Sequence, residues 1–257
     1  MTITLYDFPA KRDEHTAWNP NVWKTRYSLV YKNLPYRTVL VEFPDLEHIM
    51  QLLGAAPTET KPDGSPKYTL PVIHDSATNA VVSDSFTIAQ YLEETYPSPP
   101  LFPNGTHAFH ASFNDLFPAR IEPMLQFLIP SIACVLNPRS EVYFRRTRKE
   151  MFGMELTELY PAKGSEKREK EWRRFEEGLG MLDRTMRKND ILIMGGNLPC
   201  FADFTVAGWL CSFRTVFGAD SEEWRGLMQW HDGRWYRFMK AVEKYEHDSV
   251  QPMLARL

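Results

Sequence analysis

The sequence predicts an α/β domain over residues 1–96, a linker over 97–104 and an all-α domain over 105–257. Three observations support this prediction. Strand and helix signals alternate through the first hundred residues in the order β-α-β-α-β-β-α. Four prolines then fall within residues 97–103, and they exclude a helix there because proline lacks the backbone N–H and clashes with the preceding turn. Beyond the linker every strong periodic signal is helical.

The first domain can be divided by its apolar runs and its helix-start residues. Asn19 followed by Pro20 predicts a helix start, because asparagine caps free N–H groups and proline fits the first helical position. We expect that helix to end at Asn33-Leu34-Pro35. The other expected elements are strands over 3–8 and 36–43, a weaker helix over 45–53, a polar loop over 58–66, strands over 69–74 and 80–82, and a helix over 84–95.

The second domain contains two kinds of expected helix. Residues 201–216 are apolar nearly all round, which predicts a central buried helix. An amphipathic helix is predicted where apolar residues recur at spacings of three and four, at Trp172, Phe175, Leu179, Leu182 and Met186. Pro118, Pro123 and Pro130 are expected to break the helical region 109–136 into kinked pieces.

Composition excludes several classes of function. The chain is 43% hydrophobic and 25% charged with a net charge of -3, so it has no electrostatic reason to bind nucleic acid or an anionic membrane. Its first residues lack the charged region and the long apolar region of a secretory signal, so none is expected, and no apolar run is long enough to span a bilayer. Its three cysteines form no Cys-x-x-Cys pair, and its histidines show no metal-ligand spacing. We expect a cytoplasmic protein without a metal site.

Two short motifs predict a binding site for a small peptide. Proline is unusual in a strand because it cannot donate to the sheet, so a tight or cis turn is expected at Leu70-Pro71. Such a turn leaves the N–H and C=O groups of Leu70 free to pair with an extended ligand. Asp84 and Ser85 open the next helix, whose start favours an anion. A peptide with a free carboxylate, such as glutathione, fits both features; the alternative for Asp84 and Ser85 is helix capping alone.

These motifs, the element order and the helical second domain resemble the soluble glutathione transferases over essentially the whole chain. Residues 17–26 (AWNPNVWKTR) and 61–71 (KPDGSPKYTLP) are similar to the fungal-specific Fua class, which is related to bacterial etherase-type transferases acting on lignin fragments. The resemblance implies a thioredoxin-like N-terminal domain, an all-α C-terminal domain, glutathione as co-substrate and a homodimer.

The resemblance also implies roles for individual residues. Leu70 would pair with the cysteinyl unit of glutathione, and Pro71 would form the cis turn. Asn19 stands where this class usually has a serine that activates the glutathione thiol. An amide N–H can also donate to a thiolate, and donors or helix dipoles are what lower a thiol pKa. The alternative for Asn19 is a simple helix cap, and glutathionyl-cysteine chemistry is not expected because it needs a cysteine there.

For the remaining candidate residues, an ordinary structural or surface role is the alternative to a role in binding. Lys61 and Lys67 are candidates for the glycyl carboxylate of glutathione, although loop lysines are usually solvated. Candidates for an acceptor pocket are Trp18, Phe113, Phe117, Trp209 and Phe213, although aromatic residues at helical spacing are more often core. Cys200 and Asp203 are read as a structural helix start, with cysteine in place of the usual hydroxyl residue.

Three functions follow from this sequence. The first is a detoxification enzyme that adds glutathione to hydrophobic aromatic electrophiles, or uses it to reduce peroxides. The second is a ligandin that holds plant or wood phenolics in the same cleft with little turnover, which the replacement at Asn19 favours. The third is a regulatory or scaffold protein on a transferase fold without affinity for glutathione.

Overall fold

The computed structural model describes residues 2–11, 17–246 and 253–254. Its N-terminal part is built on a mixed sheet of order β6-β5-β1-β2-β7. β1 runs parallel to β2 and antiparallel to β5. The strands of this sheet are β1 (Ile3–Asp7), β2 (Tyr36–Leu40), β5 (Val72–Asp75), β6 (Ala80–Ser83) and β7 (Met253–Leu254). This arrangement confirms the predicted thioredoxin-like domain.

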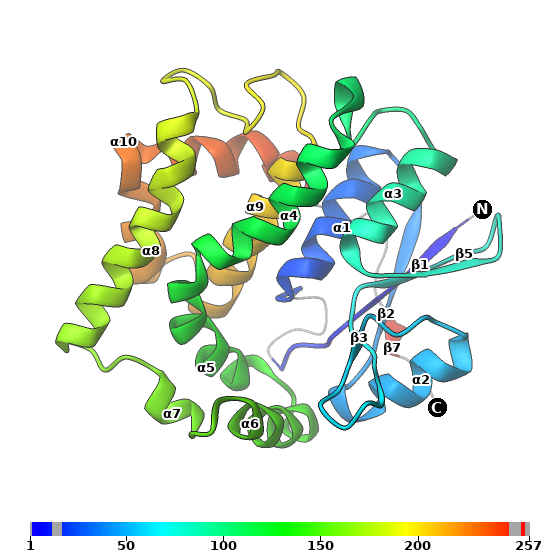
Figure 1. Cartoon of the computed structure of the whole chain (residues 1–257), viewed down its shortest axis with the longest axis horizontal. Coiled ribbons are helices and arrows are strands. Elements are labelled where there is room, and N and C mark those ends of the chain that lie inside the picture. Colours follow the sequence, from blue (N-terminus) through cyan, green and yellow to red (C-terminus); the bar gives the residue numbers. More distant parts are fainter. Residues whose placement is uncertain (1, 12–16, 247–252, 255–257) are drawn as a thin grey trace.

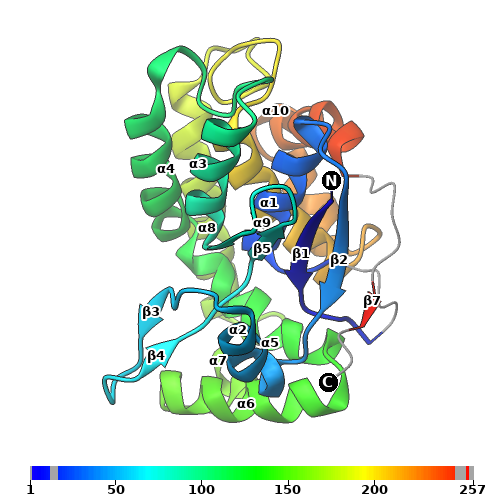
Figure 2. The ribbon, with the colours of Figure 1, turned by 90° about the vertical axis from the view of Figure 1, so that its right-hand side faces the viewer.

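Three helices accompany the sheet (Figures 1 and 2). α1 (Pro20–Tyr31) and α3 (Ser85–Thr95) lie side by side between the sheet and the helical part of the molecule, and α2 (Leu46–Leu53) follows β2. The predicted start of α1 is confirmed, because Asn19 is its N-cap and Pro20 its first residue. Asn19, at the start of α1, therefore lies where the sheet domain meets the helical part.

The main differences from the predicted elements lie at β2, at the polar loop and at β5. β2 ends at Leu40 rather than at residue 43, because Pro44 helps to set a 3-10 turn over Phe43–Asp45. The expected polar loop contains a small two-stranded sheet, β3 (Glu59–Thr60) with β4 (Pro66–Lys67). β5 begins at Val72, directly after the Leu70-Pro71 turn, and not at residue 69.

The C-terminal part is helical, as predicted, except that β7 near its end joins the sheet beside β2. Its helices are α4 (His107–Arg120), α5 (Leu125–Val135), α6 (Pro138–Phe152), α7 (Leu156–Leu159), α8 (Glu166–Thr185), α9 (Phe201–Phe217) and α10 (Glu222–Val242). The chain breaks at the 3-10 turn holding Pro123, whereas Pro118 and Pro130 lie inside α4 and α5. In the described part of the chain, no helix combines the length and the apolar character needed to cross a membrane.

α9 is the central buried helix that its apolar sequence predicts. Every residue from Phe201 to Phe213 is buried except Trp209. α9 packs closely on α1 at Gly208: a Cβ atom added there would lie 2.6 Å from the backbone oxygen of Pro20. Tyr27 of α1 stacks on Phe204 of α9 with ring centroids 5.4 Å apart. The helical part is thus joined to the sheet domain through α1.

The start of α9 is held by one buried carboxylate. Asp203 accepts hydrogen bonds from the backbone N–H groups of Ile193 (2.7 Å) and Cys200 (2.8 Å), and from the Cys200 thiol (3.1 Å). Burial raises the pKa of Asp203, and these hydrogen bonds oppose that rise. The structural role predicted for this pair agrees with these contacts.

We expect Asp203→Ala to destabilise the protein by about 3 kcal/mol, because it leaves the backbone N–H groups of Ile193 and Cys200 without an acceptor. Cys200→Ser is the matched control. It keeps the donor to Asp203 and adds a better acceptor, so its stability should stay within about 1 kcal/mol of the parent. Urea unfolding measures both values, and equal stabilities for the two variants would contradict this account of the helix start.

His110 is a second buried polar residue, and its side chain makes no hydrogen bond in the described structure. Its side chain is fully buried between Phe102 and Phe109, with ring centroids 5.3 Å from each. Neither ring nitrogen has a partner. Burial therefore lowers the pKa of His110 to about 4, which keeps the imidazole neutral at physiological pH.

Because the folded pKa of His110 lies below the unfolded value of about 6.5, the unfolded chain takes up the proton first as the pH falls. Stability from the neutral imidazole is complete above about pH 6.5 and is lost towards pH 4. We expect His110→Leu to reduce the stability loss between pH 7 and pH 5 by about 2 kcal/mol relative to the parent. Urea unfolding at both pH values tests this, and parallel losses in the two proteins would contradict it.

Candidate functional site

The Leu70-Pro71 peptide bond is cis, and it directly precedes β5. The backbone oxygen of Pro71 accepts a hydrogen bond from the N–H of Asp84 at 3.2 Å. Among the described residues, no backbone hydrogen bond outside regular elements uses the N–H or the C=O of Leu70. Leu70 thus presents both a donor and an acceptor beside the first turn of α3.

Asp84 caps α3 from a backbone conformation that few residues adopt. Its φ is 76° and its ψ is 134°, a positive-φ conformation outside the αL well that a non-glycine residue rarely adopts. One carboxylate oxygen, Oδ1, accepts hydrogen bonds from the backbone N–H groups of Phe86 and Thr87, both at 2.9 Å. Within the described structure the other oxygen, Oδ2, has no such partner. Ser85 is the buried first residue of this helix.

A cavity of about 460 Å³ brings Leu70, Pro71 and Asp84 together. Its size lies in the range of small-molecule sites. The other walls are formed by Asn21, residues 56–59, Thr69, Ser83 and Thr87. The hydroxyl groups of Thr58 and Thr69 are hydrogen-bonded at 2.8 Å and tie two of these walls together. Backbone donors and acceptors, a carboxylate and a helix start converge here, which suits an extended zwitterionic peptide.

Sequence reasoning missed Asn21, Thr58, Thr69 and Thr87. Threonine in a loop or a first helical turn carries no distinctive signal by itself. Asn21 lies two residues after Asn19 and was treated only as part of the helix. The neighbouring Asn19 cap was the one sequence signal for Asn21, since the first N–H groups of a helix have no partner within the helix and point out from its N-terminus.

Asn19 lies half-buried at the start of α1, two residues before Asn21, which forms part of the cavity wall. Its side-chain oxygen accepts from the backbone N–H of Asn21 at 2.9 Å and of Val22 at 3.2 Å. The capping role considered for Asn19 is therefore present. Because Oδ1 is used by the helix, the Nδ2 amide group is the part of Asn19 that can donate to a ligand.

The two candidate lysines lie outside the walls of this cavity. Lys61 forms an ion pair with Glu47 at 2.7 Å, and Lys67 forms one with Glu59 at 2.6 Å. Both pairs are solvent-exposed, and such pairs contribute little to stability and exchange readily. Glu59 itself lines the cavity.

The five candidate aromatic residues occupy different environments. Trp18 and Phe213 are buried: Trp18 stacks on Phe8, and Phe213 packs against Trp172 and Phe217. Phe113 and Phe117 stack on each other along α4, with centroids 5.4 Å apart. Trp209 is partly exposed, but its Nε1 atom is buried without a hydrogen-bond partner in the described structure.

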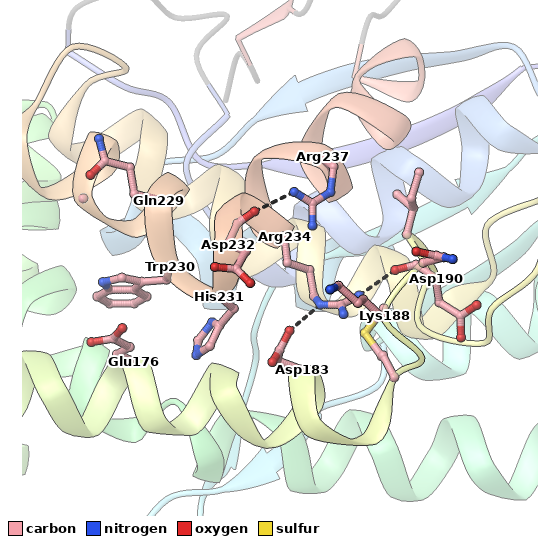
Figure 3. Close-up of a pocket in the computed structure, with 14 residues that line it drawn as sticks. Glu176, Asp183, Lys188, Asp190, Gln229, Trp230, His231, Asp232, Arg234 and Arg237 are labelled. Atoms are coloured by element: carbon pink, nitrogen blue, oxygen red, sulfur yellow. Dashed lines mark hydrogen bonds and ion pairs between the residues drawn. The ribbon is translucent and has the colours of Figure 1, made fainter.

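A larger cavity of about 1020 Å³ lies between α8 and α10 (Figure 3). α10 departs from helical backbone angles there, with φ values of 53° at His231 and 57° at Asp232. Arg234 lies between Asp183 and Asp190, and it donates to the Asp183 carboxylate and to the Asp190 backbone oxygen. These contacts neutralise its charge within the protein. The predicted ligand-binding residues do not line this cavity, so the smaller one is the candidate site.

Two family models together match most of the chain. One, described as glutathione S-transferase, C-terminal domain, matches residues 108–245, and the other, glutathione S-transferase, N-terminal domain, matches residues 18–95. The glutathione S-transferase-like protein ustS of Aspergillus flavus is 35% identical over 233 residues, which cover 84% of this chain and 80% of that protein.

Solved fungal structures are similar along nearly the whole length. A glutathione S-transferase of Ceriporiopsis subvermispora in complex with glutathione is 42% identical, with a TM-score of 0.90 over 95% of this chain and 98% of that one. Glutathione transferase GSTFuA3 of Phanerochaete chrysosporium is 41% identical, with a TM-score of 0.89 over 97% and 99% of the two chains. The family and the fold inferred from the sequence are confirmed.

Two substitutions at Asp84 separate its capping role from its charge. Asp84→Asn keeps a capping oxygen on a side chain of the same shape, so its stability should stay within about 0.5 kcal/mol of the parent. Asp84→Ala loses the cap and should cost about 1–2 kcal/mol. Thermal or urea unfolding distinguishes the two, and an alanine variant as stable as the asparagine variant would contradict the capping geometry.

Proposed function

Because the chain belongs to the glutathione S-transferase family, we propose that it binds glutathione in the cavity beside Leu70 and Asp84 and transfers the glutathionyl group to hydrophobic aromatic electrophiles, or uses glutathione to reduce peroxides. The observation that carries this proposal is the convergence of the cis Leu70-Pro71 turn and the Asp84-capped start of α3 on one cavity. The complex of a 42% identical relative with glutathione supports it.

The polar groups of the cavity match those of glutathione. The N–H and C=O of Leu70 would pair with the backbone of the cysteinyl unit. The N-terminal turn of α3 at Ser85 favours the γ-glutamyl carboxylate, and the second carboxylate oxygen of Asp84 suits its ammonium group. Lys61 and Lys67 would reach the glycyl carboxylate only by leaving Glu47 and Glu59, at little cost for exposed ion pairs.

Asn19 is proposed to support the thiolate. Its Nδ2–H group and the positive end of α1 would both favour ionisation of the glutathione thiol, whose proton passes to solvent. In conjugation, the thiolate sulfur then forms a bond to an electrophilic carbon while the leaving group departs with its electron pair. In peroxide reduction, the sulfur attacks one peroxide oxygen and releases an alcohol, and a second glutathione displaces hydroxide to give the disulfide.

We further propose that the acceptor lies between the start of α1 and the helical part of the chain. Trp18, Phe113, Phe117, Trp209 and Phe213 are its proposed neighbours. The partly exposed ones, Phe113 and Trp209, are accessible to a ligand in this structure. A cytoplasmic homodimer is the proposed form of the protein, in line with the charge balance and the family.

A ligandin is the second candidate function. The observation that favours it is that the Asn19 oxygen is already engaged as a helix cap, so a single amide group is left for thiol activation. In this case phenolic compounds would occupy the same cleft and glutathione would bind with little turnover. A scaffold protein without affinity for glutathione is the third reading, and one titration with glutathione tests it.

Three variants at Asn19 discriminate between enzyme and ligandin. Asn19→Ser keeps a capping oxygen and supplies a hydroxyl donor, so turnover of an aryl halide or a peroxide should rise or be retained. Asn19→Asp keeps the cap but replaces the donor by a negative charge, which should raise the pKa of the bound thiol and lower kcat/KM by about tenfold or more. Asn19→Ala removes both cap and donor, so turnover should collapse.

Steady-state kinetics with these variants is combined with titrations of glutathione and a phenolic ligand. If the protein is an enzyme, phenolic binding should persist in all three variants, and turnover should fall in the variants that lack a hydrogen-bond donor at residue 19. Equal turnover in Asn19→Asp and the parent would show that Asn19 does not activate the thiol. Undetectable turnover throughout, with phenolic binding intact, would favour the ligandin.

A further inference from the structure

The described walls of the cavity beside Leu70 carry two carboxylates and no basic side chain. The carboxylates belong to Asp84, at the start of α3, and to Glu59, in β3; the other described walls are uncharged. Glutathione itself carries two carboxylates and one ammonium group, so its charges do not match these walls throughout. Asp84 is the proposed partner of the ammonium group. Glu59 is therefore an acidic wall for which glutathione offers no positive charge.

Glu59 belongs to the hairpin of β3 and β4, which extends away from the rest of the sheet domain (Figure 2). It lies directly opposite Lys67 in this hairpin, and its carboxylate accepts a hydrogen bond from the Lys67 ammonium at 2.6 Å. The N–H of Thr58 donates to the backbone oxygen of Lys67 at 3.0 Å, which holds the two strands together beside the cavity. Of the charged pair, Glu59 lines the cavity and Lys67 does not. A ligand at this wall therefore meets the carboxylate before the ammonium.

The C-terminal end of a bound glutathione is the part that meets this wall. In the proposed orientation the γ-glutamyl end lies at Asp84 and the cysteinyl unit pairs with Leu70. The largest wall left for the glycyl end is the segment 56–59, which ends at Glu59. The glycyl carboxylate and the Glu59 carboxylate then repel each other and compete for the Lys67 ammonium.

We propose that Glu59 is a specificity-determining residue that makes the site prefer glutathione derivatives whose glycyl carboxyl group is joined in an amide, above all an amide that carries an amine. This inference rests on the proposed function, because it takes glutathione as the peptide bound beside Leu70. An amide has no negative charge for Glu59 to repel, and its N–H group can donate to the carboxylate. An amine on the amide adds a favourable positive charge. Free glutathione binds as well, but it has to share Lys67 with Glu59.

Isothermal titration of three ligands tests this assignment. The ligands are glutathione, its C-terminal carboxamide and its C-terminal 2-aminoethylamide, whose ends are negative, neutral and positive. The parent should bind the carboxamide about threefold more tightly than glutathione, and the aminoethylamide more tightly still, since one exposed charge contact changes an affinity by about this factor. Salt at about 1 M should reduce these differences, because it screens exposed charges.

Two variants show whether Glu59 is the cause. In Glu59→Gln, glutathione should become the tightest of the three ligands, because Lys67 is freed for the glycyl carboxylate. Glu222→Gln is the matched control: Glu222 also forms an exposed ion pair with a lysine, Lys163, at 2.9 Å, and it lies on α10 outside the cavity walls. It should keep the parent's order of affinities. A structural role would not change that order, because a general loosening weakens all three ligands alike.

Two results overturn the assignment of Glu59 and leave the proposed function standing. One is a parent that binds free glutathione at least as tightly as the carboxamide. The other is a Glu59→Gln variant that keeps the parent's order of affinities. A parent that binds none of the three ligands overturns the proposed function and this inference with it.

Discussion

The close packing of α1 on α9 at Gly208 is the contact on which the rest of the site depends. A Cβ at residue 208 would lie 2.6 Å from the backbone oxygen of Pro20, and a backbone atom cannot move aside as a flexible side chain can. Glycine therefore allows the first turn of α1 to approach the helical part of the chain. That approach fixes the direction of Asn19, buries Lys24 and sets the distance between the thioredoxin-like domain and the helices around α9.

Helix caps provide most of the polar chemistry near this contact. Asn19, Asp84 and Asp203 each hold the start of a helix with a side-chain oxygen. At Asn19 and Asp84 one polar atom serves the helix and a second atom, Nδ2 or Oδ2, is left for a ligand. Asp203 uses both of its oxygens internally and is structural. At Asn19 and Asp84, capping a helix is thus compatible with binding a ligand.

The sequence predicted those parts of the molecule that depend on local signals. The Asn19-Pro20 helix start, the Leu70-Pro71 turn, the Asp84 cap and the buried α9 are all encoded by residues close together in the chain. The cavity walls at Thr58 and Thr69 were not predicted, because the α2–β3 connection comes near β5 only in the folded chain. The burial of Lys24 was missed for the same reason: a helical lysine is normally solvated, and here α4 and a glycine on α9 enclose it.

We propose that glutathione occupies the cavity between the cis turn and α3, and a crystal structure grown with saturating glutathione would reveal its position. We expect the cysteinyl backbone to pair with Leu70, the γ-glutamyl end to lie at Asp84 and Ser85, and the sulfur to face Asn19. Glutathione bound instead in the larger cavity between α8 and α10, or with its cysteinyl backbone away from Leu70, would contradict it.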